Sequence, residues 1–172
     1  AMESRGLGDV YKRQDEVGSI IDELDKNEDL SYTIYQSSEN NKVTGYAIPI
    51  AGKGLWGTMY GYFAIEPDAE TVKGITFYKH KETPGLGAEV DKDWFKNNFV
   101  GKKLTNKNGE LVSIEVIKGY VSDTDPDAPH KVDGISGATI TGTGLTTFLK
   151  SDLQKYEPYF AKVRSVNQIE SL

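Results

Sequence analysis

Four consecutive β-rich segments occupy positions 31–80, and they limit the possible folds more than any other feature of the sequence. Alternating polar and apolar residues between turn-forming clusters predict strands. The connection SSENN at 37–41 is typical of a hairpin, and Gly61 in the third segment indicates a bulge or close packing. The segments are SYTIYQ (31–36), KVTGYAIPI (42–50), GTMYGYFAIEP (57–67) and ETVKGITFYKH (70–80), the last with Val72, Ile75 and Phe77 as its apolar positions.

Three further segments repeat their apolar residues at helical spacing. Asp91 is suited to the N-cap of the second predicted helix and Gly101 to its C-cap. Pro158 is expected to break or kink the third. The apolar positions are Ile20, Ile21 and Leu24 within 15–26, Trp94, Phe95 and Phe99 within 91–99, and Leu145, Phe148, Leu149, Leu153 and Tyr156 within 138–163.

The order of these elements indicates the fold class. KNGE at 107–110 is an Asn-Gly hairpin signal that leads into a predicted strand at 111–120, and a loop rich in proline and aspartate follows at 122–132. Strands in succession, with helices inserted and appended, indicate an α+β fold with a mostly antiparallel sheet and flanking helices. A length of 172 residues predicts a single domain. We assign it to 15–172 and set 1–14 aside as a tag, a linker or an uncertain N-terminal segment.

Charge and composition argue against several classes of protein. A formal net charge of -6 argues against a nucleic-acid-binding protein, which normally has a basic stripe. The chain has no cysteine, which excludes disulfides, thiolate metal sites and cysteine nucleophiles. Two histidines, His80 and His130, are too few for a histidine metal site, and we predict no metal. The longest apolar run is far shorter than the ~18 residues that span a bilayer.

GKGLWG at 52–57 has the G-x-G-x-x-G spacing of a dinucleotide-binding fingerprint. That fingerprint requires a helix directly after the glycines, and a β-rich segment follows here instead. We interpret the stretch as a glycine-rich connection between two strands. It places Leu55 and Trp56 at a loop tip, where they either join the core or form the wall of a flat ligand pocket.

Three aspartates, Asp123, Asp125 and Asp127, are spaced like the start of a calcium-binding loop. The sixth position of such a loop is a glycine and the twelfth a glutamate, but Ala128 and Gly134 stand there. We therefore predict a solvated acidic loop.

DGISGATITGTG at 133–144 holds four glycines and four hydroxyl side chains directly before an apolar-periodic segment. Its glycine spacing is that of a P-loop, but Thr143 stands where the lysine should be, so an NTPase is not expected. At a helix start, with Ser136 as N-cap and Lys131 or His130 nearby, backbone N–H groups could bind a lone phosphate such as that of FMN. A glycine-rich beginning of an ordinary helix fits the spacing equally well.

Three motifs resemble a known family. The residues from Asp133 to Thr139 match the flavinylation motif Asp-x-x-[Ser/Thr]-Gly-Ala-[Ser/Thr], and HKETPGLG at 80–87 is typical of the FMN-bearing subunits of two related respiratory complexes. These subunits are the NqrC family, of the sodium-translocating NADH:quinone reductase, and the RnfG family, of the Rnf complex. GKGLWGTMYG at 52–61 resembles the first of the two. The resemblance extends over about 42–160.

The resemblance implies one FMN per chain, joined through its phosphate to the hydroxyl of Thr139 by a separate flavin transferase. Trp56 and Leu86 would flank the isoalloxazine ring. No catalytic residue is predicted, because a relay flavin needs neither a general base nor a nucleophile. The other implied cofactor-binding residues are Leu55, Glu82, Thr83, Gly85 and Lys131, with Ser136, Gly137, Ala138 and Thr141 around the phosphate.

The resemblance also implies a role and a location. The chain would carry electrons in a sodium-pumping oxidoreductase, with the other subunits of the complex as partners. Family members begin with a transmembrane helix, which this sequence lacks, and place the flavin domain on the periplasmic side of the bacterial inner membrane. The alternatives are a member of the RnfG family in the Rnf complex and a non-redox module that holds a phosphorylated ligand without a covalent bond.

Overall fold

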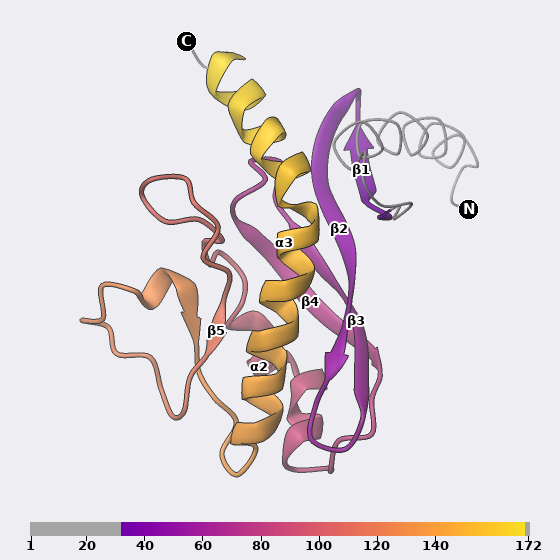
Figure 1. Cartoon of the computed structure of the whole chain (residues 1–172), viewed down its shortest axis with the longest axis vertical. Helices are drawn as coiled ribbons and strands as arrows, with labels where there is room; N and C mark the ends of the chain where they lie inside the picture. Colours follow the sequence, from indigo (N-terminus) through magenta and orange to yellow (C-terminus); the bar gives the residue numbers. More distant parts are fainter. Residues whose placement is uncertain (1–31, 171–172) are drawn as a thin grey trace.

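The computed structural model of the chain describes residues 32–170, in which a four-stranded antiparallel sheet packs against one long helix (Figure 1). The strands lie in the sheet in chain order, so the predicted α+β class and the antiparallel sheet are confirmed. The helix predicted at 15–26 lies outside the described residues. The main elements are β1 (Tyr35–Glu39), β2 (Lys42–Lys53), β3 (Thr58–Ile65), β4 (Val72–Lys79) and α3 (Thr139–Glu170).

The hairpin between β1 and β2 is confirmed, but its turn is tighter than predicted. Asn40 and Asn41 have φ angles of 49° and 61°, the left-handed conformation that a two-residue hairpin turn requires and that asparagine tolerates. Glu39 therefore pairs directly with Lys42. As a result, residues 37–39 belong to the strand and not to the connection.

Gly61 combines the bulge and the close packing that its position indicated. The register between β3 and β4 shifts between Tyr60 and Gly61. A Cβ atom at Gly61 would lie 2.1 Å from the carbonyl oxygen of Thr76 on the neighbouring strand. Only glycine therefore allows the two backbones to approach this closely.

The hydrophobic core lies between the sheet and α3. The predicted stripe of the C-terminal helix is confirmed, because all five of its apolar residues are buried, as are the three predicted on β4. Burial of alternate residues along the strands leaves the other face of the sheet outside the core. The strand residues buried in this core include Ile48, Ile50, Met59, Phe63, Ile65, Val72, Ile75 and Phe77.

Pro158 does not break the last helix, which continues to Glu170. A proline inside a helix removes one backbone hydrogen bond and crowds the preceding turn. Tertiary packing offsets this cost, because the buried rings of Tyr159 and Phe160 lie 6.1 and 5.6 Å from the ring of Tyr46. Beyond them, Arg164 donates a hydrogen bond of 3.0 Å to the carbonyl oxygen of Ala69.

The helix predicted at 91–99 is present as the shorter helix α2 (Asp93–Asn97), which follows the 3-10 helix η1 (Gly87–Asp91). Lys92, not Asp91, is the N-cap of α2, and Asn98, not Gly101, is its C-cap. The carboxylate of Asp91 instead pairs with His80 at 2.7 Å. Trp94 is exposed, while Phe95 and Phe99 are buried, because neighbouring residues cannot share one helix face but residues four apart can.

The strand predicted at 111–120 is reduced to β5 (Glu115–Val116), which pairs in parallel with β6 (Lys131–Val132). The Asn-Gly turn before it is present, with an isolated bridge between Thr105 and Leu111. The alternation of side-chain directions that a strand requires ends after this bridge, because Ser113 has a φ of 68°. The N–H groups of Val112 and Ser113 then both donate to the carbonyl oxygen of Leu104.

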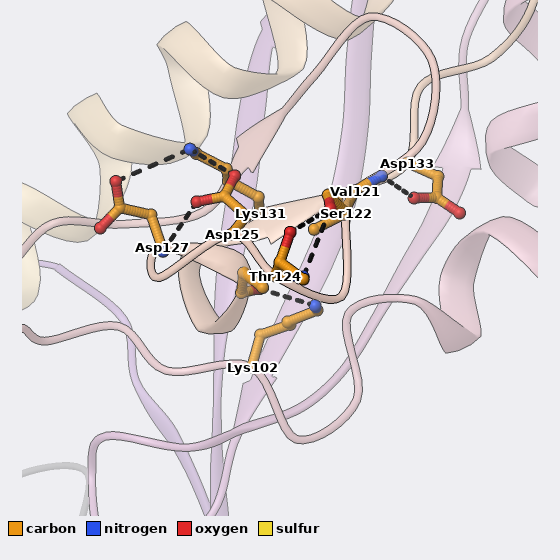
Figure 2. A network of polar contacts seen from close by, with 9 residues as sticks. Lys102, Val121, Ser122, Thr124, Asp125, Asp127, Lys131 and Asp133 are labelled. Atoms are coloured by element: carbon orange, nitrogen blue, oxygen red, sulfur yellow. Dashed lines mark hydrogen bonds and ion pairs between the residues drawn. The ribbon is translucent and has the colours of Figure 1, made fainter.

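A lysine within the acidic loop at 122–132 neutralises part of its negative charge (Figure 2). The ammonium of Lys131 lies 2.9 Å from the Asp125 carboxylate and 3.7 Å from that of Asp127. The hydrogen bond to Asp125 raises the pKa of Lys131 and, reciprocally, lowers the pKa of Asp125. The described part of the chain, 32–170, contains no group of three or more histidine or acidic residues that could hold a metal ion. The loop ends at the 3-10 helix η2 (Ala128–His130).

The ionisation of Tyr156 is expected to lower the stability of the domain at alkaline pH. Burial, with a further contribution from the nearby Asp152 carboxylate, raises the pKa of Tyr156 to about 12. Below the ordinary pKa of about 10 the phenol is neutral in both the folded and the unfolded chain, so its contribution to stability is intact. Between pH values of about 10 and 12 only the unfolded chain loses the proton, so the free energy of unfolding is expected to fall. Denaturant unfolding should show a smaller fall in this range for Tyr156→Phe than for the native chain.

Candidate functional site

The loop between β2 and β3, residues 54–57, presents two large apolar side chains at the tip of a hairpin. The N–H of Gly54 donates to the carbonyl oxygen of Gly57 at 2.8 Å, which closes the loop. Leu55 and Trp56 are exposed, and Trp56 retains 64% of its accessible surface. The stretch joins antiparallel strands, so the predicted glycine-rich connection is confirmed and a dinucleotide-binding turn is excluded.

Two glycines let this hairpin pack directly on α3. A Cβ atom at Gly144 of the helix would lie 2.2 Å from the carbonyl oxygen of Lys53. A Cβ atom at Gly52 of the strand would lie 2.0 Å from the Cβ of Phe148. The end of β2 and the second turn of α3 are therefore in backbone contact, which brings the hairpin loop to the start of the helix.

Glu82, in the connection after β4, joins this loop to α3. Its side chain is buried, with 6% of the residue surface exposed. The carboxylate accepts hydrogen bonds from the N–H groups of Leu55 and Trp56 at 3.2 and 3.0 Å. It also accepts one from the hydroxyl of Thr141, which is 1% exposed. The three motif segments of the sequence are thus brought together at a single carboxylate.

The segment after Glu82 holds the Trp56 ring and presents Leu86. The indole Nε1 of Trp56 donates to the hydroxyl of Thr83 at 3.0 Å. The carbonyl oxygen of Thr83 accepts the N–H of Leu86 at 3.1 Å, across a turn in which Gly85 has a φ of 73°. The side chain of Leu86 is exposed, and a Cβ atom at Gly137 would lie 2.9 Å from its Cδ2.

The beginning of α3 differs from the predicted one. Gly137, with a φ of 74°, lies in a turn that the N–H of Ala138 closes by donating to Ile135 at 3.0 Å. The helix begins only at Thr139, so Ala138 and not Ser136 stands at the N-cap position. The N–H of Gly142 donates to the carbonyl oxygen of Ala138. The N–H groups of residues 139–141 precede this bond and have no acceptor four residues back within the helix.

The three threonines in the first two turns of α3 have different environments. Thr139 is exposed, whereas Thr141 is buried and bound to Glu82. Thr143 is exposed, and its hydroxyl donates to the carbonyl oxygen of Thr139 at 3.0 Å. A reagent or an enzyme that modifies a hydroxyl here therefore has direct access to Thr139 and Thr143 but not to Thr141.

A cavity of about 210 Å³ lies beside Thr139, between the start of α3 and the segment after β5. Lys118 lines it together with Glu115 and Thr143. Lys118 was missed by the sequence analysis, because it belongs to no motif and falls within the predicted strand. The ammonium of Lys131, the predicted cation, pairs with two aspartates of the acidic loop (Figure 2).

The family model of the FMN-binding domain matches residues 54–154 of the chain, which include the hairpin loop, Glu82 and the start of α3. The chain is a member of this family. The family match therefore covers all the candidate residues that the structure brings together around Glu82.

The curated proteins that resemble this chain include NqrC subunits from several bacteria. The NqrC subunit of the Na(+)-translocating NADH-quinone reductase from Pseudomonas aeruginosa is 36% identical over 95% of the chain, which covers 61% of that protein. Its counterpart from Haemophilus ducreyi is 42% identical over 74% of the chain, which covers 48% of that protein. The chain therefore spans roughly half to three-fifths of these relatives. The resemblance to the NqrC family is confirmed.

Solved structures of the family have the same fold. The crystal structure of Shewanella oneidensis NqrC superposes with a TM-score of 0.68 at 32% identity, over 78% of this chain and 61% of that one. The corresponding subunit of the Parabacteroides distasonis reductase superposes with a TM-score of 0.67 at 37% identity, over 75% of this chain and 62% of that one.

In residues 32–170, no helix is both long and apolar enough to cross a membrane.

Proposed function

We propose that this chain is the electron-carrying, FMN-bearing part of an NqrC subunit of a Na⁺-translocating NADH:quinone reductase, with one FMN joined through its phosphate to Thr139. The observation that carries the proposal is the arrangement around Glu82. The Glu82 carboxylate joins the loop at 54–57, here called the Trp56 loop, to the first turn of α3. Thr139 is the accessible hydroxyl of that turn. Membership of the FMN-binding domain family supports the identity of the cofactor.

The start of α3 fits a phosphate. The N–H groups at 139–141 lack helical acceptors, and a helix N-terminus favours negative charge. At Gly137 the positive φ of 74° strains any residue with a Cβ atom, so the turn favours glycine. A phosphoester at Thr139 would carry one residual negative charge. The helix terminus, with Lys118 in the adjacent cavity, can balance it without the lysine of a P-loop.

FMN, when bound, supplies the chemistry of accepting electrons and passing them on. The residues of the chain would bind and orient it. Trp56 and Leu86 are exposed apolar side chains on neighbouring loops that can cover parts of a flat ring and exclude water from it. The hydrogen bond from Trp56 to Thr83 fixes the orientation of the indole. No proton transfer to or from a side chain is required for this role.

The proposal extends to partners and location. A flavin transferase would attach the FMN, and the other subunits of the reductase would deliver and remove the electrons. The domain would lie on the periplasmic side of the bacterial inner membrane. A covalent bond suits this location, because a reversibly bound cofactor would be lost by dilution.

The test is to express the chain with and without an active flavin transferase and to analyse it on a denaturing gel. We expect a band that fluoresces yellow-green under ultraviolet light, together with the mass increase of one FMN phosphoester, only when the transferase is present. A colourless band with the transferase shown to be active on another substrate would contradict covalent attachment. Yellow protein that loses its colour on denaturation would instead indicate the non-covalent alternative.

Trp56→Ala is expected to change the properties of the attached flavin. An aromatic contact with the ring is worth about 0.5–1.5 kcal/mol. If about 1 kcal/mol of this depends on the redox state, the midpoint potential shifts by roughly 20 mV for a two-electron couple. Potentiometric titration and flavin emission spectra measure the change. Trp94→Ala is the matched control, because Trp94 is also exposed but binds Glu89 on η1. Equal spectra and potentials for the native chain and Trp56→Ala would remove Trp56 from the site.

A further inference from the structure

We infer that Glu82 is the positioning residue of the site: its buried carboxylate holds the Trp56 loop in a fixed relation to the first turn of α3, and it makes no contact with the cofactor. The sequence resemblance had implied that Glu82 binds the flavin. The part of the inference that concerns flavin rests on the proposed function. The part that concerns the loop rests on the contacts of the chain alone.

The carboxylate of Glu82 is occupied by hydrogen bonds from the chain itself. Its oxygens accept three hydrogen bonds from the chain, two from backbone N–H groups and one from Thr141. Cβ atoms built at Gly54 and Gly87 would each lie 2.6 Å from one of these oxygens. Glycine on both sides is therefore what allows the carboxylate to enter, and the chain leaves only 6% of the residue surface exposed.

Glu82 is itself held in place by the neighbouring segment. Its backbone N–H donates to Nδ1 of His80 at 3.1 Å. Because this nitrogen accepts, the proton of a neutral His80 ring is on Nε2, which pairs with Asp91 at 2.7 Å. The next residue, Thr83, binds the indole of Trp56. Two consecutive residues thus hold Trp56. Glu82 binds the backbone N–H of Trp56, and Thr83 binds its indole ring.

These contacts order the exposed side chain of Trp56 before a ligand binds. Trp56 is 64% exposed, in a loop that begins and ends with Gly54 and Gly57, so packing alone would leave this loop mobile. Bonds to a buried carboxylate remove that freedom before any ligand arrives, which lowers the entropic cost of binding. The same carboxylate binds Thr141, two residues from the proposed attachment point. The ring wall and the attachment point therefore share one anchor.

Substitutions at Glu82 should have graded effects. In Glu82→Gln the amide oxygen replaces one carboxylate oxygen, and the NH₂ group faces either the Leu55 or the Trp56 N–H, so one backbone bond is lost. In Glu82→Ala all three bonds are lost. Thr141→Val removes only the hydroxyl. The loop should therefore be most mobile in the alanine variant and less affected in the other two.

The experiment measures the picosecond-to-nanosecond backbone order parameter of Trp56 by ¹⁵N relaxation in the flavin-free protein. We expect about 0.85 for the native chain and below about 0.6 for Glu82→Ala, with Glu82→Gln between them. Asp152→Asn is the matched control. Asp152 is also 6% exposed, and its carboxylate joins α3 to the N–H of Ala51 on β2. This variant should lower the melting temperature but leave the order parameter of Trp56 unchanged.

The outcomes separate the positioning role from general stability. An order parameter at Trp56 that stays at the native value in Glu82→Ala and Glu82→Gln overturns the inference, as does an equal fall in Asp152→Asn. If Glu82→Ala does not fold, Glu82→Gln and Thr141→Val decide by the same measurement. With flavin attached, Glu82→Gln should also shift the midpoint potential, whereas Asp152→Asn should not. Failure of the native chain to accept flavin would contradict the proposed function and leave the order parameters as the test of Glu82.

Discussion

Replacing Thr139 with alanine is expected to abolish covalent flavin attachment completely. The substitution removes the accessible hydroxyl at the first residue of α3, and the nearest alternative, Thr141, is buried against Glu82. The fluorescent band on a denaturing gel and the FMN mass increase should both disappear. Stability should change by no more than about 0.5 kcal/mol, because the side chain is exposed.

Thr143→Ala is the matched control for this prediction. Thr143 is also exposed and lies one helical turn further along α3, and its hydroxyl binds the carbonyl oxygen of Thr139. The control variant should retain the full fluorescent band. A band that persists in Thr139→Ala and disappears in Thr143→Ala would mean that the attachment point is one turn further along the helix.

Gly144→Ala is expected to cause a large loss of stability, although alanine normally stabilises a helix relative to glycine by about 0.5–1 kcal/mol. The sign reverses here because the new Cβ atom would lie 2.2 Å from the carbonyl oxygen of Lys53, and backbone on both sides cannot yield cheaply. We expect a destabilisation of about 2–3 kcal/mol. The melting temperature should fall by roughly 5–10 °C, as measured by calorimetry or circular dichroism.

Gly74→Ala is the control for the effect of alanine itself. Gly74 is a strand residue at which a Cβ atom would meet nothing within 4 Å. This variant should be neutral or slightly more stable than the native chain. If Gly144→Ala were as stable as Gly74→Ala, the close contact between α3 and the end of β2 would be wrong.

The sequence was sufficient to predict the sheet and the core face of the last helix, because both depend on local periodicity. Strand alternation and the stripe from Leu145 to Tyr156 need no knowledge of distant residues. Pro158 shows the limit of this approach. Its local propensity to end a helix is overcome by the packing of Tyr159 and Phe160 on Tyr46, a contact about 110 residues away in sequence.

The candidate site was predictable as a set of segments but not as an arrangement. Glycine spacing and the motif matches identified the loops at 52–57, 80–87 and 133–144. Nothing in a single sequence distinguishes a buried, fully hydrogen-bonded acid such as Glu82 from a solvated one. For the same reason, the sequence could not show that the ammonium of Lys131 pairs with Asp125 or that Lys118 lines the cavity beside Thr139.

The proposed attachment point and the core of the domain belong to one uninterrupted helix. With 32 residues at 1.5 Å per residue, α3 is about 48 Å long. Thr139 is its first residue, and its buried face packs on the sheet without a hinge between them. A group fixed to Thr139 therefore cannot travel as one does on a flexible linker, which swings between partners. Under the proposed function, electron donors and acceptors would have to come to a stationary carrier, so the docking of neighbouring subunits, not the reach of a tether, would set the transfer distances.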